Sequence, residues 1–237
     1  MSHSDLAALK RDAAVRALDF VKPGMKLGLG TGSTAEAFLD VLAPKVAAGF
    51  QIVGVPTSQR TADRARTLGI PIAELDDTAP LDLTIDGADE ADRDLNLIKG
   101  GGGALLREKI VAASSKAMVV IADGSKLVDR LGAYALPVEV IGFGARTTIT
   151  RIERAIAALG YRDIPITLRG NADGPFRTDS GHKIFDCAFG AIADAPALAS
   201  ALSIVPGVVD HGLFIGIATA LVIARPEGVE VLTRKAS

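Results

Sequence analysis

The chain has 237 residues, of which 49% are hydrophobic and 23% charged, and its formal net charge is −2. This length suits one large domain or two modest ones, and the composition is ordinary for a protein with a packed core. Because no basic excess is present, nucleic acid is not expected as the main partner. The lack of Trp also argues against a base-stacking surface.

The sequence gives no sign of secretion or of a membrane span. The N-terminus has no cationic stretch followed by an apolar run, and the longest apolar runs end well short of the ~20 residues that cross a bilayer. The single cysteine, Cys187, cannot form an internal disulfide, which fits a reducing compartment. We therefore predict a cytoplasmic protein that does not bind membranes.

The first half of the chain alternates strands with helices. The spacing of apolar residues predicts an amphipathic helix over 5–21, which Pro23 and Gly24 end. Apolar runs predict strands over 25–29, 51–56, 81–86 and 117–122. The segments between them predict helices after 34, over 58–68 and over 104–115. Ser58 is the expected N-cap of the helix over 58–68. This alternation implies parallel pairing with right-handed crossovers, hence a Rossmann-like, mostly parallel α/β sheet.

The second half has a different pattern. We expect a strand over 136–143, a helix over 147–160, a β-hairpin that turns at Ser180 and Gly181, and a short helix over 194–202. This β-α-β-β-α order predicts a second, smaller α+β domain of the ferredoxin-like kind. The apolar tail is expected to return to the first sheet. The predicted division is an α/β domain of residues 1–131 plus 208–237, and a small domain of residues 132–207.

Three segments combine chemistry-bearing residues with glycine, and each begins where a predicted strand ends, the place where α/β sheets bind ligands. The first is the glycine-rich run from Gly28 to Thr34 (GLGTGST). Its glycines let the backbone approach an anion at the start of the next helix. The alternative is a tight turn with Ser33 as a helix N-cap. No Lys follows the last glycine and no third glycine stands at dinucleotide spacing, so a Walker loop is excluded and NAD is only weakly supported.

The second segment is DGADE, from Asp86 to Glu90, directly after a predicted strand. Carboxylates placed there could be acid–base groups, a cation site or a solvated turn. A divalent metal needs several oxygen ligands, and the nearby Lys99 favours internal charge balance instead. We therefore expect no metal.

The third segment runs from Lys99 through four glycines to the helix that contains Glu108. Four successive glycines lose much chain entropy on folding, so a compensating role is expected. Glu108 lies about one turn into the helix and could point back to the glycines, with Ile110 and Val111 toward the core. The alternative is that the charged residues around Glu108 form a solvated helix face.

The remaining candidates are weaker. Lys126 follows another predicted strand, but taken alone it and Lys10 are more often exposed lysines. The three histidines share no metal-ligand spacing, and no G-x-S-x-G elbow for a serine nucleophile is present. Cys187 is expected to be a small buried hydrophobe.

Taken together, GTGST, DGADE and KGGGGALLREKI, in this order, resemble the type A ribose-5-phosphate isomerase family. The likeness continues through ADGSK, LPVEV, TDSGHKIFDCAFG and PGVVDHGLF, so it covers nearly the whole chain. Any one motif would be unspecific, whereas the conjunction is highly specific. One departure is His182, which stands where the family often has Asn.

The resemblance implies a cytoplasmic aldose–ketose isomerase of the pentose phosphate pathway that interconverts D-ribose 5-phosphate and D-ribulose 5-phosphate without metal or organic cofactor. It implies Glu108 as the base that moves a proton between C2 and C1. Asp86 and Asp89 would handle the sugar hydroxyls, and Lys99 with the glycine backbone would stabilise the enediolate. It also implies a homodimer or homotetramer. The substrate-binding residues implied are Thr31, Gly32, Ser33, Thr34, Asp86, Gly87, Ala88, Asp89, Lys99, Gly100, Gly101, Gly102 and Lys126, with Lys10 as a further phosphate ligand.

Two other functions stay open from the residues alone. A non-catalytic sugar-phosphate sensor would share a phosphate loop, but it would have no need for a base such as Glu108. A nucleotide- or CoA-using transferase on a similar sheet is the third reading, since a fold alone does not fix a function.

Overall fold

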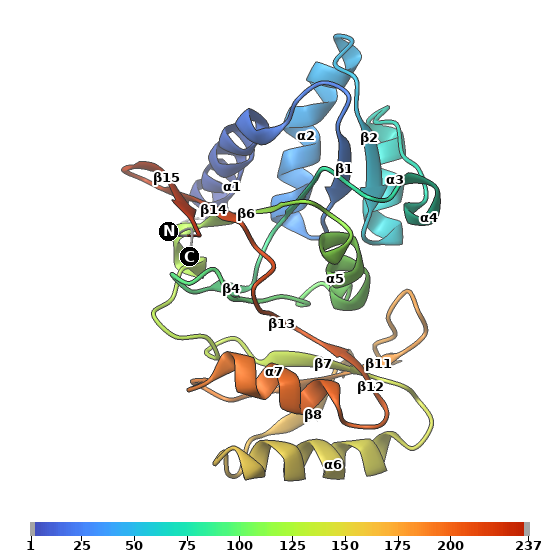
Figure 1. The fold of residues 1–237 in the computed structure, drawn as a ribbon, viewed down its shortest axis with the longest axis vertical. Helices are drawn as coiled ribbons and strands as arrows, with labels where there is room; N and C mark the ends of the chain where they lie inside the picture. The colour runs from blue at the N-terminus through green and yellow to red at the C-terminus, as the bar shows by residue number, and fades with distance from the viewer. Residues whose placement is uncertain (1–2, 235–237) are drawn as a thin grey trace.

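The computed structural model describes residues 3–234 and contains one large sheet, one smaller sheet and a short sheet between them (Figure 1). The large sheet has the order β15-β14-β6-β3-β1-β2. Its strands are β1 (Lys26–Leu29), β2 (Val53–Pro56), β3 (Leu83–Asp86), β6 (Met118–Asp123), β14 (Ala220–Arg225) and β15 (Gly228–Thr233). All its pairings are parallel except that of β14 with β15. The predicted Rossmann-like sheet is confirmed, and the apolar tail does rejoin it.

Helices cover both faces of this sheet. They are α1 (His3–Ala17), followed by the 3₁₀ turn η1 (Leu18–Phe20), α2 (Ser33–Ala47), α3 (Gln59–Thr67), α4 (Leu75–Thr78), α5 (Leu105–Ala113) and the 3₁₀ turn η2 (Gly124–Lys126). Apolar side chains of α1 and α2 form one core with residues of β1, β3, β6 and β14. β6 is buried along its whole length, which explains the continuous apolar run from Met118 to Ala122.

The small domain is an antiparallel sheet in the order β12-β7-β11-β8, against which α6 (Ala145–Ala158) and α7 (Ala195–Ser203) pack. Its strands are β7 (Leu136–Val140), β8 (Ile166–Leu168), β11 (Lys183–Cys187) and β12 (Val208–His211), with a two-stranded ribbon of β9 (Gly170–Asn171) and β10 (Gly174–Pro175) inserted after β8. The chain order β-α-β-β-α-β confirms the ferredoxin-like prediction.

The structure differs from the sequence prediction at two places in this domain. The turn at Ser180 and Gly181 forms, with Gly181 N donating to Thr178 O, but β9 and β10 lie between β8 and this turn. The strands on either side, β8 and β11, pair antiparallel as expected of a hairpin, and β11 pairs with β7 on its other side. Because β12 also pairs with β7, the predicted division before residue 208 separates β12 from its own sheet. We propose a boundary after His211.

The short sheet β13-β5-β4 connects the two domains. Its strands are β4 (Glu90–Ala91), β5 (Leu97–Ile98) and β13 (Leu213–Phe214), and Figure 1 shows them between the two larger sheets. Just past β5, Lys99 N donates to Gly212 O at 2.9 Å, which fixes the start of the glycine loop. None of the helices within residues 3–234 is long and apolar enough to cross a membrane.

Candidate active site

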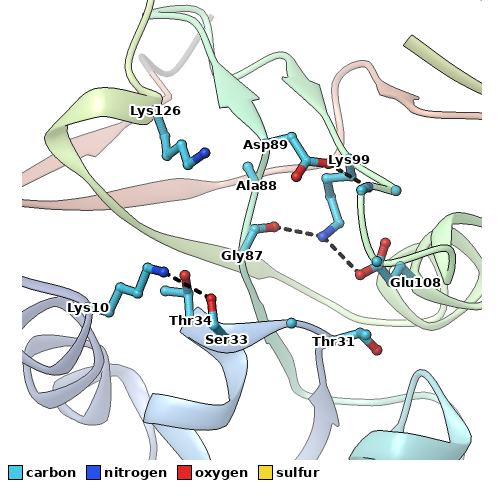
Figure 2. Close-up of a pocket in the computed structure, with 14 residues that line it drawn as sticks. Lys10, Thr31, Ser33, Thr34, Gly87, Ala88, Asp89, Lys99, Glu108 and Lys126 are labelled. Carbon is cyan, nitrogen blue, oxygen red and sulfur yellow. Dashed lines mark hydrogen bonds and ion pairs between the residues drawn. The ribbon is translucent and has the colours of Figure 1, made fainter. Parts of the chain in front are cut away.

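The loops that follow β1, β3, β5 and β6 enclose a cavity of about 250 Å³ (Figure 2). Parallel strands bring their carboxyl ends to one edge of the sheet, which explains why the loops after β1, β3 and β6 meet there. The loop after β5 comes from the short antiparallel sheet. The residues that line it are Lys10, Thr31, Gly32, Ser33, Thr34, Gly87, Ala88, Asp89, Lys99, Gly100, Gly101, Gly102, Glu108 and Lys126. The structure therefore brings together all the residues predicted for the site except Asp86.

One end of the cavity is suited to an anion. Gly32 has a φ of 100° and is the N-cap of α2, so α2 begins at Ser33. The alternative in which Ser33 is itself the N-cap is therefore wrong. Lys10 Nζ donates to Ser33 Oγ at 2.9 Å, and Figure 2 shows Lys126 beside this end of the cavity. Two ammonium groups and a helix N-terminus favour negative charge.

Asp86 lies behind the wall of the cavity, not in it. Its side chain is fully buried, and its Oδ1 accepts hydrogen bonds from Thr31 N at 3.1 Å and Gly87 N at 2.7 Å. Lys99 Nζ lies 2.9 Å from Asp86 Oδ2. Gly30 permits this close approach, since a Cβ there would overlap the Asp86 carboxylate.

Lys99 occupies the centre of a buried charge cluster. Its Nζ donates to Gly87 O at 2.6 Å and lies 3.3 Å from Glu108 Oε1 (Figure 2). Burial disfavours the ammonium, but the carboxylates of Asp86 and Glu108 outweigh burial and raise the pKa of Lys99 above its ordinary value. Lys99 is therefore a permanently charged donor, as expected from the charge balance that the sequence suggested.

Glu108 is the buried base candidate. It stands in the first turn of α5, its side chain is 5% exposed, and no residue described in the structure donates a hydrogen bond to its Oε2. Burial, and then the charge of Asp86, raise the pKa of Glu108 to about 8, although Lys99 opposes the shift. Val111 shares this buried face, whereas Ile110 is 46% exposed, so the prediction that both face the core is wrong for Ile110.

Asp89 and the glycine loop form the part of the cavity wall next to Lys99 and Glu108. Asp89 Oδ2 accepts a hydrogen bond from Gly101 N at 2.7 Å, and both residues line the cavity. A Cβ at Gly101 would overlap the Asp89 carboxylate, so glycine is required for this approach. Asp89 thus presents a partly exposed carboxylate beside Lys99 and Glu108.

The hydroxyl of Thr31 is held by a network that the sequence did not reveal. Thr31 Oγ1 lies 2.8 Å from Thr57 Oγ1, 2.8 Å from Ser58 Oγ and 3.2 Å from Thr61 Oγ1. Figure 2 shows this side chain directed away from Glu108. The only sequence signal was Ser58, which caps α3 as predicted by accepting from Thr61 N. Thr31 therefore positions the loop with its side chain.

Within residues 3–234 no group of three or more His, Cys, Asp and Glu side chains could hold a metal ion. His182 and His211 lie in the small domain, where His182 Nδ1 is 2.9 Å from Glu139 Oε1. Cys187 is buried, as predicted. The chemistry available in the cavity comes from two carboxylates, three ammonium groups, hydroxyls and backbone amides.

This fold and site define an α/β protein whose small cavity has buried carboxylates and Lys99 at one end and a glycine-rich loop with Lys10 and Lys126 at the other. A sequence model described as ribose 5-phosphate isomerase A (phosphoriboisomerase A) matches residues 53–228. The chain belongs to this family, and it is an isomerase.

Relatives agree over nearly the whole chain. The ribose-5-phosphate isomerase A of Sinorhizobium fredii is 58% identical over 97% of this chain and 99% of its own, and that of Parvibaculum lavamentivorans is 58% identical over 94% and 96%. The solved ribose 5-phosphate isomerase of Plasmodium falciparum has a TM-score of 0.92 at 38% identity and covers 97% of this chain and 100% of its own. A second solved isomerase, in complex with phospho-erythronic acid, has a TM-score of 0.89 at 38% identity, with coverage of 97% and 99%.

Proposed function

We propose that this enzyme interconverts D-ribose 5-phosphate and D-ribulose 5-phosphate through an enediolate, with Glu108 as the base. The phosphate binds at the end of the cavity formed by Lys10, Ser33 and Lys126, and the carbons that react lie near Glu108. The family membership supports the substrate, and the cavity volume of about 250 Å³ suits a small molecule.

The reaction begins on the open-chain aldose. Glu108 Oε2 takes the proton from C2, the electron pair of that C–H bond forms the C1–C2 double bond, and O1 becomes an oxyanion. Lys99 Nζ and glycine-loop amides stabilise this oxyanion, the kind of contribution that is usually the largest single factor in catalysis. A proton then moves from O2 to O1, and Glu108 returns its proton to C1, which leaves the ketose.

The two aspartates act differently in this proposal. Asp89 reaches the cavity, so it accepts and returns the hydroxyl proton during ring opening and the transfer from O2 to O1. Asp86 does not line the cavity and instead pairs with Lys99 at 2.9 Å. We therefore assign Asp86 the role of holding Lys99 in place, in contrast to the direct contact with sugar hydroxyls that the resemblance implied.

The observation that carries the proposal is the state of Glu108 Oε2. This oxygen belongs to a buried side chain that lines the cavity, yet it has no hydrogen-bond partner among the described residues. Buried polar atoms are nearly always paired, so an unpaired one at a cavity points to a partner that arrives with the substrate. A non-catalytic sensor would gain nothing from such an atom.

Replacing Glu108 by Gln tests the proposal. Glu108→Gln keeps the size of the side chain but cannot accept the C2 proton, so kcat should fall by ~10²–10⁴-fold or more. Binding of phospho-erythronic acid, measured by isothermal titration calorimetry, should persist. Glu153→Gln, at an exposed position on α6, is the matched control and should keep full activity. A Glu108→Gln enzyme with near-native kcat would refute the base assignment.

The same assay tests metal dependence. The ammonium of Lys99 already occupies the position between the two buried carboxylates, 2.9 Å from Asp86 Oδ2 and 3.3 Å from Glu108 Oε1, and it repels a second cation from that position. Activity measured after treatment with EDTA should therefore equal that of the untreated enzyme. Loss of activity that added Mg²⁺ or Zn²⁺ restores would contradict this expectation.

A further inference from the structure

The glycine loop of the active site is held from the small domain by one arginine. Arg169 follows β8, and its Nη1 donates to Gly100 O at 2.7 Å and to Gly101 O at 3.2 Å. Asp186, on β11, fixes the guanidinium: it accepts from Arg169 Nε at 2.9 Å and from Nη2 at 2.5 Å. The side chain of Arg169 is only 17% exposed. This bidentate pairing gives the guanidinium one orientation.

The two carbonyls that Arg169 binds belong to peptide units of the glycine loop that lines the cavity. In a trans peptide the C=O and the following N–H point in opposite directions. The unit that begins at the Gly100 carbonyl ends in Gly101 N, which donates to Asp89 Oδ2 at 2.7 Å. The unit that begins at the Gly101 carbonyl ends in Gly102 N, which has no acceptor among the described residues. Both Gly101 and Gly102 line the cavity.

A second contact to the loop comes from Phe176, which follows the β9–β10 ribbon just as Arg169 precedes it. Gly103 has a φ of 83°, and a Cβ there would overlap the ring of Phe176. The guanidinium carbon of Arg169 lies 6.0 Å from the centroid of that ring. The glycine backbone has more conformational freedom than that of any other residue, so each such contact restricts the loop. The direction of the amides at the active site therefore depends on a residue of another domain.

We propose that Arg169 is a positioning residue of the isomerase reaction. By holding two carbonyls of the glycine loop, it aims one amide at Asp89 and leaves the next directed into the cavity, where negative charge develops on the sugar oxygen. The inference rests on the proposed function. In this proposal the small domain sets the geometry of the oxyanion donors. The residues at the phosphate end of the cavity belong to the first domain.

Kinetics of Arg169 variants separate this role from simple support of the fold. Arg169→Ala should lower kcat by about 10²-fold, because misplacement of about 1 Å has that effect. KM should change little, since Lys10 and Lys126 are untouched. Arg169→Lys should recover part of kcat, because an ammonium can bind one carbonyl but cannot also pair bidentately with Asp186. Added guanidinium should partly rescue Arg169→Ala.

Arg177 provides the matched control. It lies just after the same β9–β10 ribbon, is exposed, and donates to a backbone carbonyl, that of Gly181, at 3.1 Å. Arg177→Ala should keep the kcat of the wild type. If Arg169→Ala does not fold, kcat and KM are measured for Arg169→Lys and Asp186→Asn instead. The proposal predicts that both variants lower kcat and leave KM nearly unchanged. Wild-type kcat in the folded variants, or a rise in KM alone, would overturn the proposal.

A binding measurement distinguishes this inference from the proposed function. Calorimetry should show that Arg169→Ala weakens the affinity for phospho-erythronic acid, whose carboxylate resembles the developing oxyanion, more than the affinity for inorganic phosphate. Equal effects on both ligands would reject the role of Arg169. Failure of the wild type to isomerise ribose 5-phosphate would reject the proposed function, and the ratio of the two affinities would still test Arg169.

Discussion

The two carboxylate oxygens of Glu108 have different surroundings, and this difference organises the site. Oε1 is 3.3 Å from the ammonium of Lys99, whereas Oε2 has no partner among the described residues. Asp86, deeper in the protein, holds the same ammonium. In the proposed mechanism, Lys99 holds the base, Glu108, and also donates to the substrate. The base and the oxyanion donor then lie in a single buried cluster.

The pH dependence of catalysis should report the ionisation of Glu108. Burial raises its pKa to about 8, and only the ionised carboxylate can accept the C2 proton. A raised pKa means that the active form is depleted as the pH falls, so kcat/KM should rise with pH and level off above about 8. The measurement is kcat/KM for ribose 5-phosphate from pH 6 to pH 9.5 at constant ionic strength. A profile that is flat across this range would show that Glu108 is already ionised at pH 6.

The motifs predict which residues meet, but they do not predict how the side chains are oriented. Gly32, Lys99 and Glu108 could be assigned to one site because the motifs that contain them were expected to fall where strands end. In the structure only Gly32 follows a strand of the parallel sheet, since Lys99 follows β5 of the short antiparallel sheet and Glu108 lies in α5. The position of Asp86 behind the wall depends on Lys99, thirteen residues further on, and on the close approach of Gly30. Such contacts arise from tertiary packing, so the local sequence does not contain them.

Helix caps show what local sequence does determine. Asp194 precedes α7 and accepts a hydrogen bond from Ala197 N at 2.9 Å, and Ser58 does the same for α3. Both helices begin within a residue of the predicted start, because the cap is a short-range interaction between a side chain and the amide three residues later. The hairpin around Gly181 was predicted less completely: β8 and β11 do pair, but the ribbon of β9 and β10 that lies between β8 and the turn was not expected.

The cap of α7 can be tested without disturbing the active site. Asp194→Ala removes the acceptor for Ala197 N and should lower the free energy of unfolding by about 1 kcal/mol. Activity should not change, because Asp194 does not line the cavity. Urea unfolding at neutral pH gives the stability. Asp173→Ala, which removes an exposed carboxylate of the same domain, is the control for charge. Equal stability of the two variants would mean that the cap contributes nothing.

At the scale of the whole molecule, the order of the large sheet lies beyond sequence reasoning. β14 pairs with β6 although about a hundred residues, including the whole small domain, separate them. Periodicity predicts that a strand exists, whereas its neighbour depends on long-range packing. The insertion of the small domain between β6 and β14 nevertheless matters for the site. Where the chain returns to the large sheet, Gly212 O accepts a hydrogen bond from Lys99 N, and within the small domain Arg169 donates to Gly100 O of the glycine loop.

The return path also contains a buried histidine that should couple stability to pH. His211 is 3% exposed; its Nδ1 accepts from Leu213 N at 3.2 Å, so Nε2 carries the proton shared with Ser203 Oγ at 3.1 Å. Burial, and then the charge of Lys109, lower the pKa of His211 to about 4, while Asp210 opposes the shift. The neutral ring thus joins β12 to α7 and to β13.

Acid should therefore weaken the fold through His211. Between about pH 6.5 and about pH 4 the unfolded chain binds a proton at His211 that the folded chain does not, so the stability present above pH 6.5 is lost as the pH falls. Urea unfolding at pH 7 and pH 5 should show a larger loss for the wild type than for His211→Gln, which does not titrate. The other ionisable groups are common to both proteins, so the difference isolates this residue. Equal losses would place the pKa of His211 near its ordinary value in the folded protein.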